Sequence, residues 1–153
     1  MTRQTPPPPP SQQSIALSID EAFQLALILH RGPSLEMAEL LYRRIIEAAP
    51  EHLDALHFCG VLCHQQNRNR DAAQLIGRII ELDPANADAH NNLGNVLEGL
   101  NRKEEAASCY RKAIALNPDH APALNNLGVV LMAQKAVEEA LKVYGREIGR
   151  AHV

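Results

Sequence analysis

Residues 88–118 read DAHNNLGNVLEGLNRKEEAASCYRKAIALNP, and the spacing of apolar and turn residues in this stretch decides the fold. Apolar side chains recur at helical spacing on both sides of a polar turn: Leu93, Val96, Leu97 and Leu100 before it, and Ala106, Tyr110, Ala113 and Ile114 after it. The spacing predicts helices over 87–100 and 103–116, joined by a turn at Asn101–Arg102. The second helix is expected to stop at Asn117–Pro118, because proline disfavours helical geometry in the residue before it.

The same pattern recurs along the chain with a period of 34 residues, the separation of Pro50 from Pro84 and of Pro84 from Pro118. The aligned rows are 19–52, 53–86, 87–120 and a shortened 121–153. Two further columns of the alignment hold small residues: Ala26, Gly60, Gly94 and Gly128 in one, and Ala38, Ala72, Ala106 and Ala140 in the other. A fixed period in this range is typical of stacked supersecondary units, each too small to bury its own apolar face. The sequence therefore predicts an all-α fold of about four helix-turn-helix units, with the small residues where two helices of a unit meet.

The composition and charge exclude several classes of protein. Hydrophobic residues make up 46% of the 153 residues and aromatic ones 3%, which favours closely approaching helices over aromatic anchors. The net charge is −3 and no repeat is strongly basic, so we expect no nucleic-acid partner. The start of the chain has no signal-peptide pattern, and the most apolar stretch, 22–29, is too short to cross a bilayer. We expect a cytoplasmic protein without a membrane partner.

The three cysteines Cys59, Cys63 and Cys109 are an odd number, which does not suggest a disulfide framework. They occupy positions where other repeats have core residues, so we expect the three cysteines to be buried and to act as small hydrophobic residues. We expect the protein to reside in a reducing compartment. His57 and His64 flank two of them and raise the question of zinc. On a helix, however, the cysteines share one face and the histidines another, so one tetrahedral ion would hardly take all four. We expect no metal and no cofactor.

Residues 1–18 form a separate leader with five consecutive prolines, Pro6 to Pro10. Proline lacks a backbone donor and favours an extended left-handed helix, so we expect this leader to stay outside the packed core as a disordered tether. The alternative is a ligand for a proline-recognising domain.

The repeated residues resemble the tetratricopeptide repeat (TPR) family. The third row matches the family pattern at six positions: Leu93, Gly94, Ala106, Tyr110, Ala113 and Pro118. The second row departs from it, because Cys59 and Cys63 replace larger apolar residues and Ile76 replaces an aromatic residue. The resemblance covers residues 19 to about 146 and implies a right-handed α-solenoid with a concave groove. It divides the chain into repeats 1 (19–52), 2 (53–86) and 3 (87–120) and a partial repeat 4 (121–146).

The fourth row loses the pattern near its end. Gly145 and Gly149 fall inside the expected helix, and Glu147 occupies a column that is apolar in the other rows. Residues 148–153 are also the translation of a sequence that looks like a common sequencing-library adapter. We expect residues 147–153 to be a non-native tail and the chain to be a fragment, the alternative being a natural end with a frayed helix.

In TPR solenoids the first helix of each pair lines the groove. By the repeat register, the expected peptide-binding groove residues are Gln24, His57, Phe58, His64, Asn91, Asn92, Asn95, Asn125, Asn126 and Met132. Asparagine amides offer both a donor and an acceptor, so Asn92 and Asn126, one period apart, are candidates to bind the backbone of an extended peptide. Ordinary solvation of groove polar groups is the alternative.

The expected function is a protein-protein interaction module that binds an extended peptide or partner protein in this groove. The asparagine column and the NNLG strings also resemble the TPR arm of O-GlcNAc transferase-type glycosyltransferases, which implies a substrate-recognition arm of a larger, truncated enzyme. A third hypothesis is self-association through an uncapped last helix bearing Leu141 and Tyr144. The sequence has no nucleophile–base pair, phosphate-cradling glycine loop or paired carboxylates, so we expect no catalytic residues and no enzyme activity from it.

Overall fold

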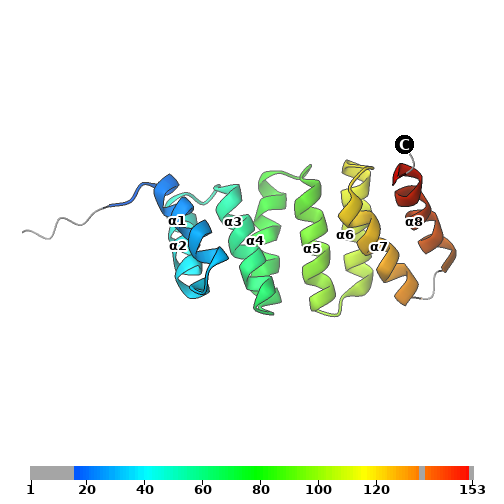
Figure 1. Cartoon of the computed structure of the whole chain (residues 1–153), viewed down its shortest axis with the longest axis horizontal. Helices are drawn as coiled ribbons and strands as arrows, with labels where there is room; N and C mark the ends of the chain where they lie inside the picture. Colours follow the sequence, from blue (N-terminus) through cyan, green and yellow to red (C-terminus); the bar gives the residue numbers. More distant parts are fainter. Residues whose placement is uncertain (1–15, 135–136, 152–153) are drawn as a thin grey trace, which may run out of the picture.

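The computed structural model describes residues 16–134 and 137–151, and these form eight α-helices without a strand. The helices are α1 (Ile19–Arg31), α2 (Leu35–Ala48), α3 (Leu53–Gln65), α4 (Asn69–Leu82), α5 (Ala87–Gly99), α6 (Lys103–Leu116), α7 (Ala121–Ala133) and α8 (Val137–Ala151). Figure 1 shows them side by side in one elongated row, from α1 at one end to α8 at the other. The predicted all-α solenoid of paired helices is confirmed, as are the helices expected over 87–100 and 103–116 to within one residue.

The first helix of each repeat begins at a side-chain cap, and the caps form a column that the sequence analysis missed. Ser18, His52, Asn86 and His120 each accept a hydrogen bond from the backbone N–H three residues further on, at 2.9 to 3.2 Å. Such caps satisfy one of the donors that a helix start leaves without a partner. Histidine is an uncommon cap, so the residue types in this column do not mark it as a capping column in the sequence.

The turns between paired helices depend on asparagine. Asn67 and Asn101, one period apart, have φ of 60° and 59°, the left-handed region in which asparagine is more tolerated than other residues with a side chain. The turn predicted at Asn101–Arg102 is confirmed. Repeat 1 turns differently, because Pro33 stands in this column and the proline ring holds φ at about −65°. The second helices α2, α4 and α6 end two residues before the proline column, as the sequence predicts.

The columns of small residues lie in the seam between paired helices, as predicted. Ala38, Ala72 and Ala106 are fully buried. A Cβ atom added to Gly94 would lie 2.4 Å from the Tyr110 ring, and one added to Gly128 would lie 2.7 Å from the Tyr144 ring. These glycines leave the room that a ring from the partner helix fills.

The core divides into two clusters that meet at α5. One cluster joins repeats 1 and 2 and reaches Ala89 and Val96, and the other joins repeats 3 and 4 from Leu97 onward. Leu93 packs against both clusters. Helix α5 therefore contributes apolar side chains to both halves of the core.

The cysteine prediction holds for two of the three residues. Cys59 and Cys63 are fully buried, but Cys109 is only half-buried. The expectation of a buried Cys109 is wrong because its thiol borders an open hollow of about 380 Å³ that Ala73, Leu93 and Arg102 also line.

The last helix continues through both of its glycines to Ala151. Leu141 and Ile148 on this helix are exposed, whereas Tyr144 lies against Gly128 in the helix seam and does not belong to an exposed apolar face. The proline run of the leader, residues 152–153 and the side chains of Ala140 and Glu147 lie outside what the structure describes. Within the described ranges, no helix is long and apolar enough to cross a membrane.

Candidate peptide-binding groove

The first helices of the repeats share one side of the solenoid. α3 contacts α5 and α5 contacts α7 directly, in addition to the contacts of each helix with its neighbours in the chain. In the described part of the chain, no two second helices of successive repeats contact each other to that extent. The first helices are therefore closer together than the second helices, which makes their side the inner one of the curved row.

The structure places the ten predicted groove residues at different depths on this side. Gln24, Asn125 and Met132 are exposed, and Asn91 is buried. The remaining six are half-buried: His57, Phe58, His64, Asn92, Asn95 and Asn126. A ligand lying on the first helices would thus meet asparagine and histidine side chains that already have contacts within the protein.

Three of the asparagines are hydrogen-bonded to one another between α5 and α7. The Asn126 amide nitrogen donates to Oδ1 of Asn91 at 3.1 Å and to Oδ1 of Asn95 at 2.9 Å. The Tyr110 hydroxyl on α6 lies 2.8 Å from Oδ1 of Asn95 and 2.7 Å from a carboxylate oxygen of Glu98. This arrangement fixes the orientation of the Asn126 amide, with both of its N–H bonds directed into the protein.

The network continues from α5 to α3 through weaker contacts. The Asn91 amide nitrogen lies 3.5 Å from Oδ1 of Asn92, and the Asn92 amide nitrogen lies 3.5 Å from Nδ1 of His57. Polar side chains are thus linked across the first helices of three successive repeats. Networks of this kind hold their members in one orientation.

Tyr110 and Glu98 are the orienting residues at this site, and sequence reasoning treated Tyr110 only as part of a core face. Burial and the hydrogen bond to Glu98 raise the pKa of the Tyr110 phenol well above its ordinary value. The phenol therefore stays protonated and keeps its donor. The signal for this role was present in the sequence, because a tyrosine stands opposite a polar residue of the first helix in repeats 1 and 3.

In repeat 1, Tyr42 stands in the column of Tyr110, and His30 stands in the column of Glu98. Nδ1 of His30 lies 3.1 Å from the Tyr42 hydroxyl, and Nε2 of His30 lies 3.3 Å from Oε1 of Gln65 on α3. His64, one period after His30, bonds instead to Asn69 at 2.6 Å, since repeat 2 has Ile76 in place of the tyrosine.

The groove becomes aromatic toward repeat 1. Phe58 stands in the column of Asn92 and Asn126, and its ring is stacked on that of Tyr42, with centroids 6.2 Å apart. The His57 ring meets the edge of Phe58 at 5.1 Å. Between the starts of α3 and α5, a hollow of about 230 Å³ is lined by four polar residues, Asp54, His57, Asn86 and Asp88, and by three apolar ones. The inner face thus offers amides over repeats 3 and 4 and rings over repeats 1 and 2.

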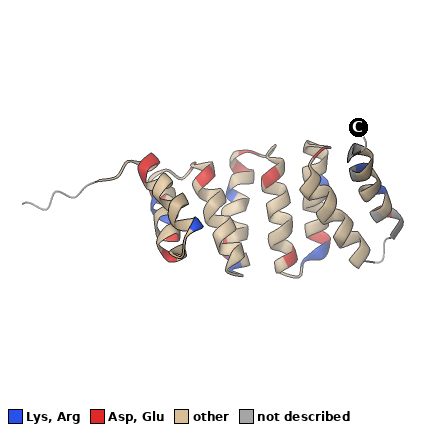
Figure 2. Cartoon of the chain, viewed as in Figure 1, with Lys and Arg blue, Asp and Glu red and all other residues tan. Residues whose placement is uncertain are grey.

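Charged residues are interspersed along the solenoid. Figure 2 shows short basic segments scattered among acidic and neutral ones along the row. Among the described residues, no group of three or more His, Cys, Asp or Glu is placed to hold a metal ion. The side chains described on the first helices offer hydrogen-bonding groups and apolar surface.

Two family models match the sequence, both described as tetratricopeptide repeats, over residues 87–120 and 109–142. The chain is a tetratricopeptide-repeat protein. TPR repeats are protein-interaction scaffolds, and this TPR chain has that architecture. No curated protein matches its sequence.

Solved structures resemble this TPR protein over most of its length. MamA superposes with a TM-score of 0.80 at 19% identity, covering 88% of this chain and 81% of that one. MamA 41-end from Desulfovibrio magneticus RS-1 gives 0.80 at 18% identity, covering 88% and 77%. An O-GlcNAc transferase mutant from Thermobaculum terrenum gives 0.67 at 32% identity, covering 74% of this chain but only 22% of the transferase. The likeness to MamA is one of fold.

Proposed function

We propose that the chain binds an extended segment of a partner protein along the inner face of α3, α5 and α7. The observation that carries this proposal is the side-chain network on that face, because it holds amide groups in fixed orientations before any ligand arrives. Binding groups that are already oriented lose less conformational entropy when a ligand docks.

The network also indicates what each amide would offer. Both N–H bonds of Asn126 are used within the protein, so its Oδ1 is left to accept a hydrogen bond from a peptide N–H. Asn92 uses its Oδ1 and one N–H, which leaves one N–H to donate to a peptide carbonyl. An extended peptide presents both kinds of group in alternation, and these two residues are one period apart.

Apolar side chains on the same face would supply the rest of the contact. Met132 and Val129 on α7 are 57% and 50% exposed, and the Phe58 ring is half-buried on α3. A peptide with apolar side chains at intervals fits this combination better than a highly charged one. This preference is part of the proposal.

The test is binding of peptides selected from a random display library, measured by fluorescence anisotropy. The pair of changes Asn92→Ala and Asn126→Ala should weaken binding by about tenfold, since each lost hydrogen bond contributes about 0.5–1.5 kcal/mol. Gln74→Ala, an exposed amide on the second helix α4, is the matched control and should leave the affinity unchanged. An affinity that survives the double change would refute the proposed role of the amides.

A second candidate is the substrate-recognition arm of a larger O-GlcNAc transferase-like enzyme. The specific observation in its favour is the 32% identity to the Thermobaculum terrenum transferase over 74% of this chain. Sequencing the source locus through the codon for Arg146 tests it. A reading frame that continues into further repeats and a catalytic domain supports this candidate, and a genuine stop after Val153 refutes it.

The proposal assigns no catalytic step to these residues and names a protein, not a nucleic acid or a membrane, as the partner. Self-association remains a separate hypothesis, now resting on the exposed Leu141 of α8 and not on Tyr144. Light scattering at high concentration decides it, because a monomer would rule it out.

A further inference from the structure

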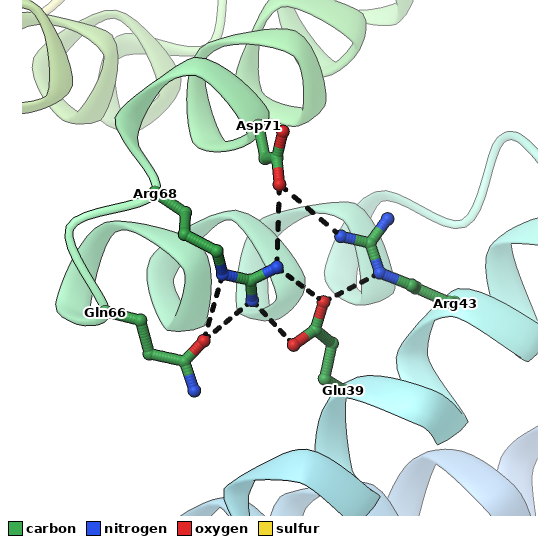
Figure 3. Close-up of polar contacts among 5 residues, drawn as sticks. All are labelled: Glu39, Arg43, Gln66, Arg68 and Asp71. Carbon is green, nitrogen blue, oxygen red and sulfur yellow. Dashed lines mark hydrogen bonds and ion pairs between the residues drawn. The ribbon is translucent and has the colours of Figure 1, made fainter.

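Ion pairs between second helices show which of their columns face a neighbouring repeat. At the junction of repeats 1 and 2 (Figure 3), a guanidinium nitrogen of Arg43 on α2 lies 3.9 Å from a carboxylate oxygen of Asp71 on α4. At the junction of repeats 3 and 4, Arg111 on α6 pairs with Glu139 on α8 at 3.1 Å. Arg43 and Arg111 share one column of the repeat, and Asp71 and Glu139 share another. The arginine column therefore faces the following repeat, and the acidic column faces the preceding one.

Repeat 1 has apolar residues on α2 where the other repeats have polar ones. Met37 stands in the column of Asp71 and Glu139 and is 52% exposed. Leu40, three residues further on, lies on the same side of the helix and is also exposed. The counterparts of Leu40 are polar in every other repeat: Gln74, Ser108 and Lys142. The side of α2 that is directed away from repeat 2 is therefore apolar.

Helix α1 continues this apolar surface. Ile28 is 68% exposed, and Leu25, three residues before it, is exposed too. The counterparts of Ile28 are at most 1% exposed: Leu62, Val96 and Val130. Those three residues belong to repeats that have a repeat before them. We call Leu25, Ile28, Met37 and Leu40 together the repeat 1 face.

Helix α8 presents a second apolar surface at the other end of the row. Leu141 stands in the column of Glu39, which faces the following repeat because it accepts two bonds from Arg68, at 3.0 and 2.6 Å. Leu141 is 66% exposed. Gly145 stands in the column of Arg43, and a Cβ atom added to it would meet nothing within 4 Å. We call Leu141 and Gly145 together the α8 face.

The two faces fit each other in the register that joins repeats inside the chain. If α1 of a second copy followed α8 as α7 follows α6, Met37 would lie opposite Gly145, as Asp71 lies opposite Arg43. The open space at Gly145 has room for a flexible methionine side chain, whereas an arginine there would have no carboxylate to meet. Leu141 would lie over the start of α2, because Ser34 is the counterpart of Arg68.

One residue of α1 differs from the internal junctions. Glu21 stands in a column that otherwise holds buried alanines: Ala55, Ala89 and Ala123. The Glu21 carboxylate is turned back onto the helix start, where it accepts from the backbone N–H of Ser18 at 2.8 Å and from its hydroxyl at 2.9 Å. The contact between copies is therefore expected to cover the later part of α1 and the start of α2.

We propose that the repeat 1 face of one copy binds the α8 face of a second copy. Burial of the exposed apolar side chains drives the association. The two faces differ, so the contact is heterologous and adds further copies in one direction. The inner faces of successive copies then continue one another as a longer groove. The association uses the ends of the row and not the inner face, so it does not depend on peptide binding.

Sedimentation equilibrium of the full chain, from micromolar to millimolar concentration, tests this proposal. The average mass of the wild type should rise with concentration. Ile28→Asp/Met37→Asp alters the repeat 1 face, and Leu141→Asp alters the α8 face. Each variant alone should associate about tenfold or more weakly, because a carboxylate would be buried against apolar side chains. An equal mixture of the two variants should form a dimer and nothing larger, since each retains one intact face.

Met132→Asp is the matched control, because it places the same charge on an exposed apolar residue of the inner face. It should associate as the wild type does. Circular dichroism checks that each variant keeps its helices, and glutamine replaces aspartate where it does not. A wild type that stays monomeric overturns the proposal, as does a mixture of folded variants that forms no dimer. Leu141→Asp that dimerises alone, or association lost in Met132→Asp, would place the contact elsewhere and also overturn it.

Discussion

Gly94→Ala is the sharpest test of the helix seam, because the added atom has one well-defined obstacle. The new Cβ would lie 2.4 Å from Cε1 of Tyr110, whereas carbon atoms normally approach to about 3.5–4.0 Å. The ring must therefore move by about 1 Å. Tyr110 is fully buried, and its hydroxyl, with one hydrogen to donate, lies 2.8 Å from Oδ1 of Asn95 and 2.7 Å from a carboxylate oxygen of Glu98, so the movement disturbs its hydrogen bonding.

The expected cost follows from three contributions. Overpacking a buried seam costs about 1–3 kcal/mol, and weakening a hydrogen bond to a charged group adds about 1 kcal/mol or more. Alanine offsets about 1 kcal/mol of this through its better helix propensity. Repeat 1 has Ala26 in the same column opposite Tyr42, so a seam of this kind is able to adjust. We therefore expect a net loss of about 2 kcal/mol in the free energy of unfolding.

Urea denaturation followed by circular dichroism measures this change. Gly77→Ala is the matched control: it lies in helix α4, and a Cβ there would meet nothing within 4 Å. It should raise the free energy of unfolding by about 0.5–1 kcal/mol through helix propensity alone. If Gly94→Ala is as stable as the wild type while Gly77→Ala gains, the placement of Tyr110 against Gly94 is refuted.

Three further predictions concern polar and turn residues. The hydrogen bond from Arg68 holds the pKa of Glu39 below its ordinary value, so this pair stabilises the fold above about pH 4.3 and loses that contribution as the pH falls through the lowered pKa. Glu39→Ala should therefore make the free energy of unfolding depend less on pH in the acid range, and an unchanged dependence would contradict this. Asn101→Thr should lower the denaturation midpoint by an equivalent of about 1–2 kcal/mol, because a β-branched residue is strained at φ of 59°, whereas Asn101→Gly should not. His120→Ala removes the acceptor for the Ala123 N–H and should cost about 0.5–2 kcal/mol in the same assay, with His120→Asn restoring most of it; equal losses in both variants would argue against a capping role.

The sequence predicted most of the fold because each structural position recurs in several repeats, so that aligned residues support the same prediction. Gly94 and Ala106 identify the seam, and Pro118 identifies the helix end, through their columns and not individually. Features found in one repeat alone had no such support. The bond from Tyr110 to Asn95 depends on the distance between two helices, which periodicity does not give. The contact of Arg68 with Glu39 joins residues 29 positions apart across a junction that no other repeat reproduces.

The sequence indicated on which helices the candidate site residues lie, but not which hydrogen bonds they make. The repeat register indicated which residues lie on the first helices, and this followed from helical periodicity. It did not indicate that Asn91 would be buried or that the Asn126 amide would donate both of its N–H groups to Asn91 and Asn95. Side-chain partners depend on the rotation of neighbouring helices, which is set by packing in three dimensions.

The division of the core at α5 has a consequence for how the chain melts. Residues of α5 belong to both apolar clusters, and Leu93 packs against each of them. Because repeat arrays are stabilised by nearest-neighbour contacts, unfolding of either half would remove packing partners of α5 and destabilise the other half. We therefore expect heating to unfold the two halves in one transition. A ligand lying across α3, α5 and α7 would contact both halves and raise the midpoint of that transition.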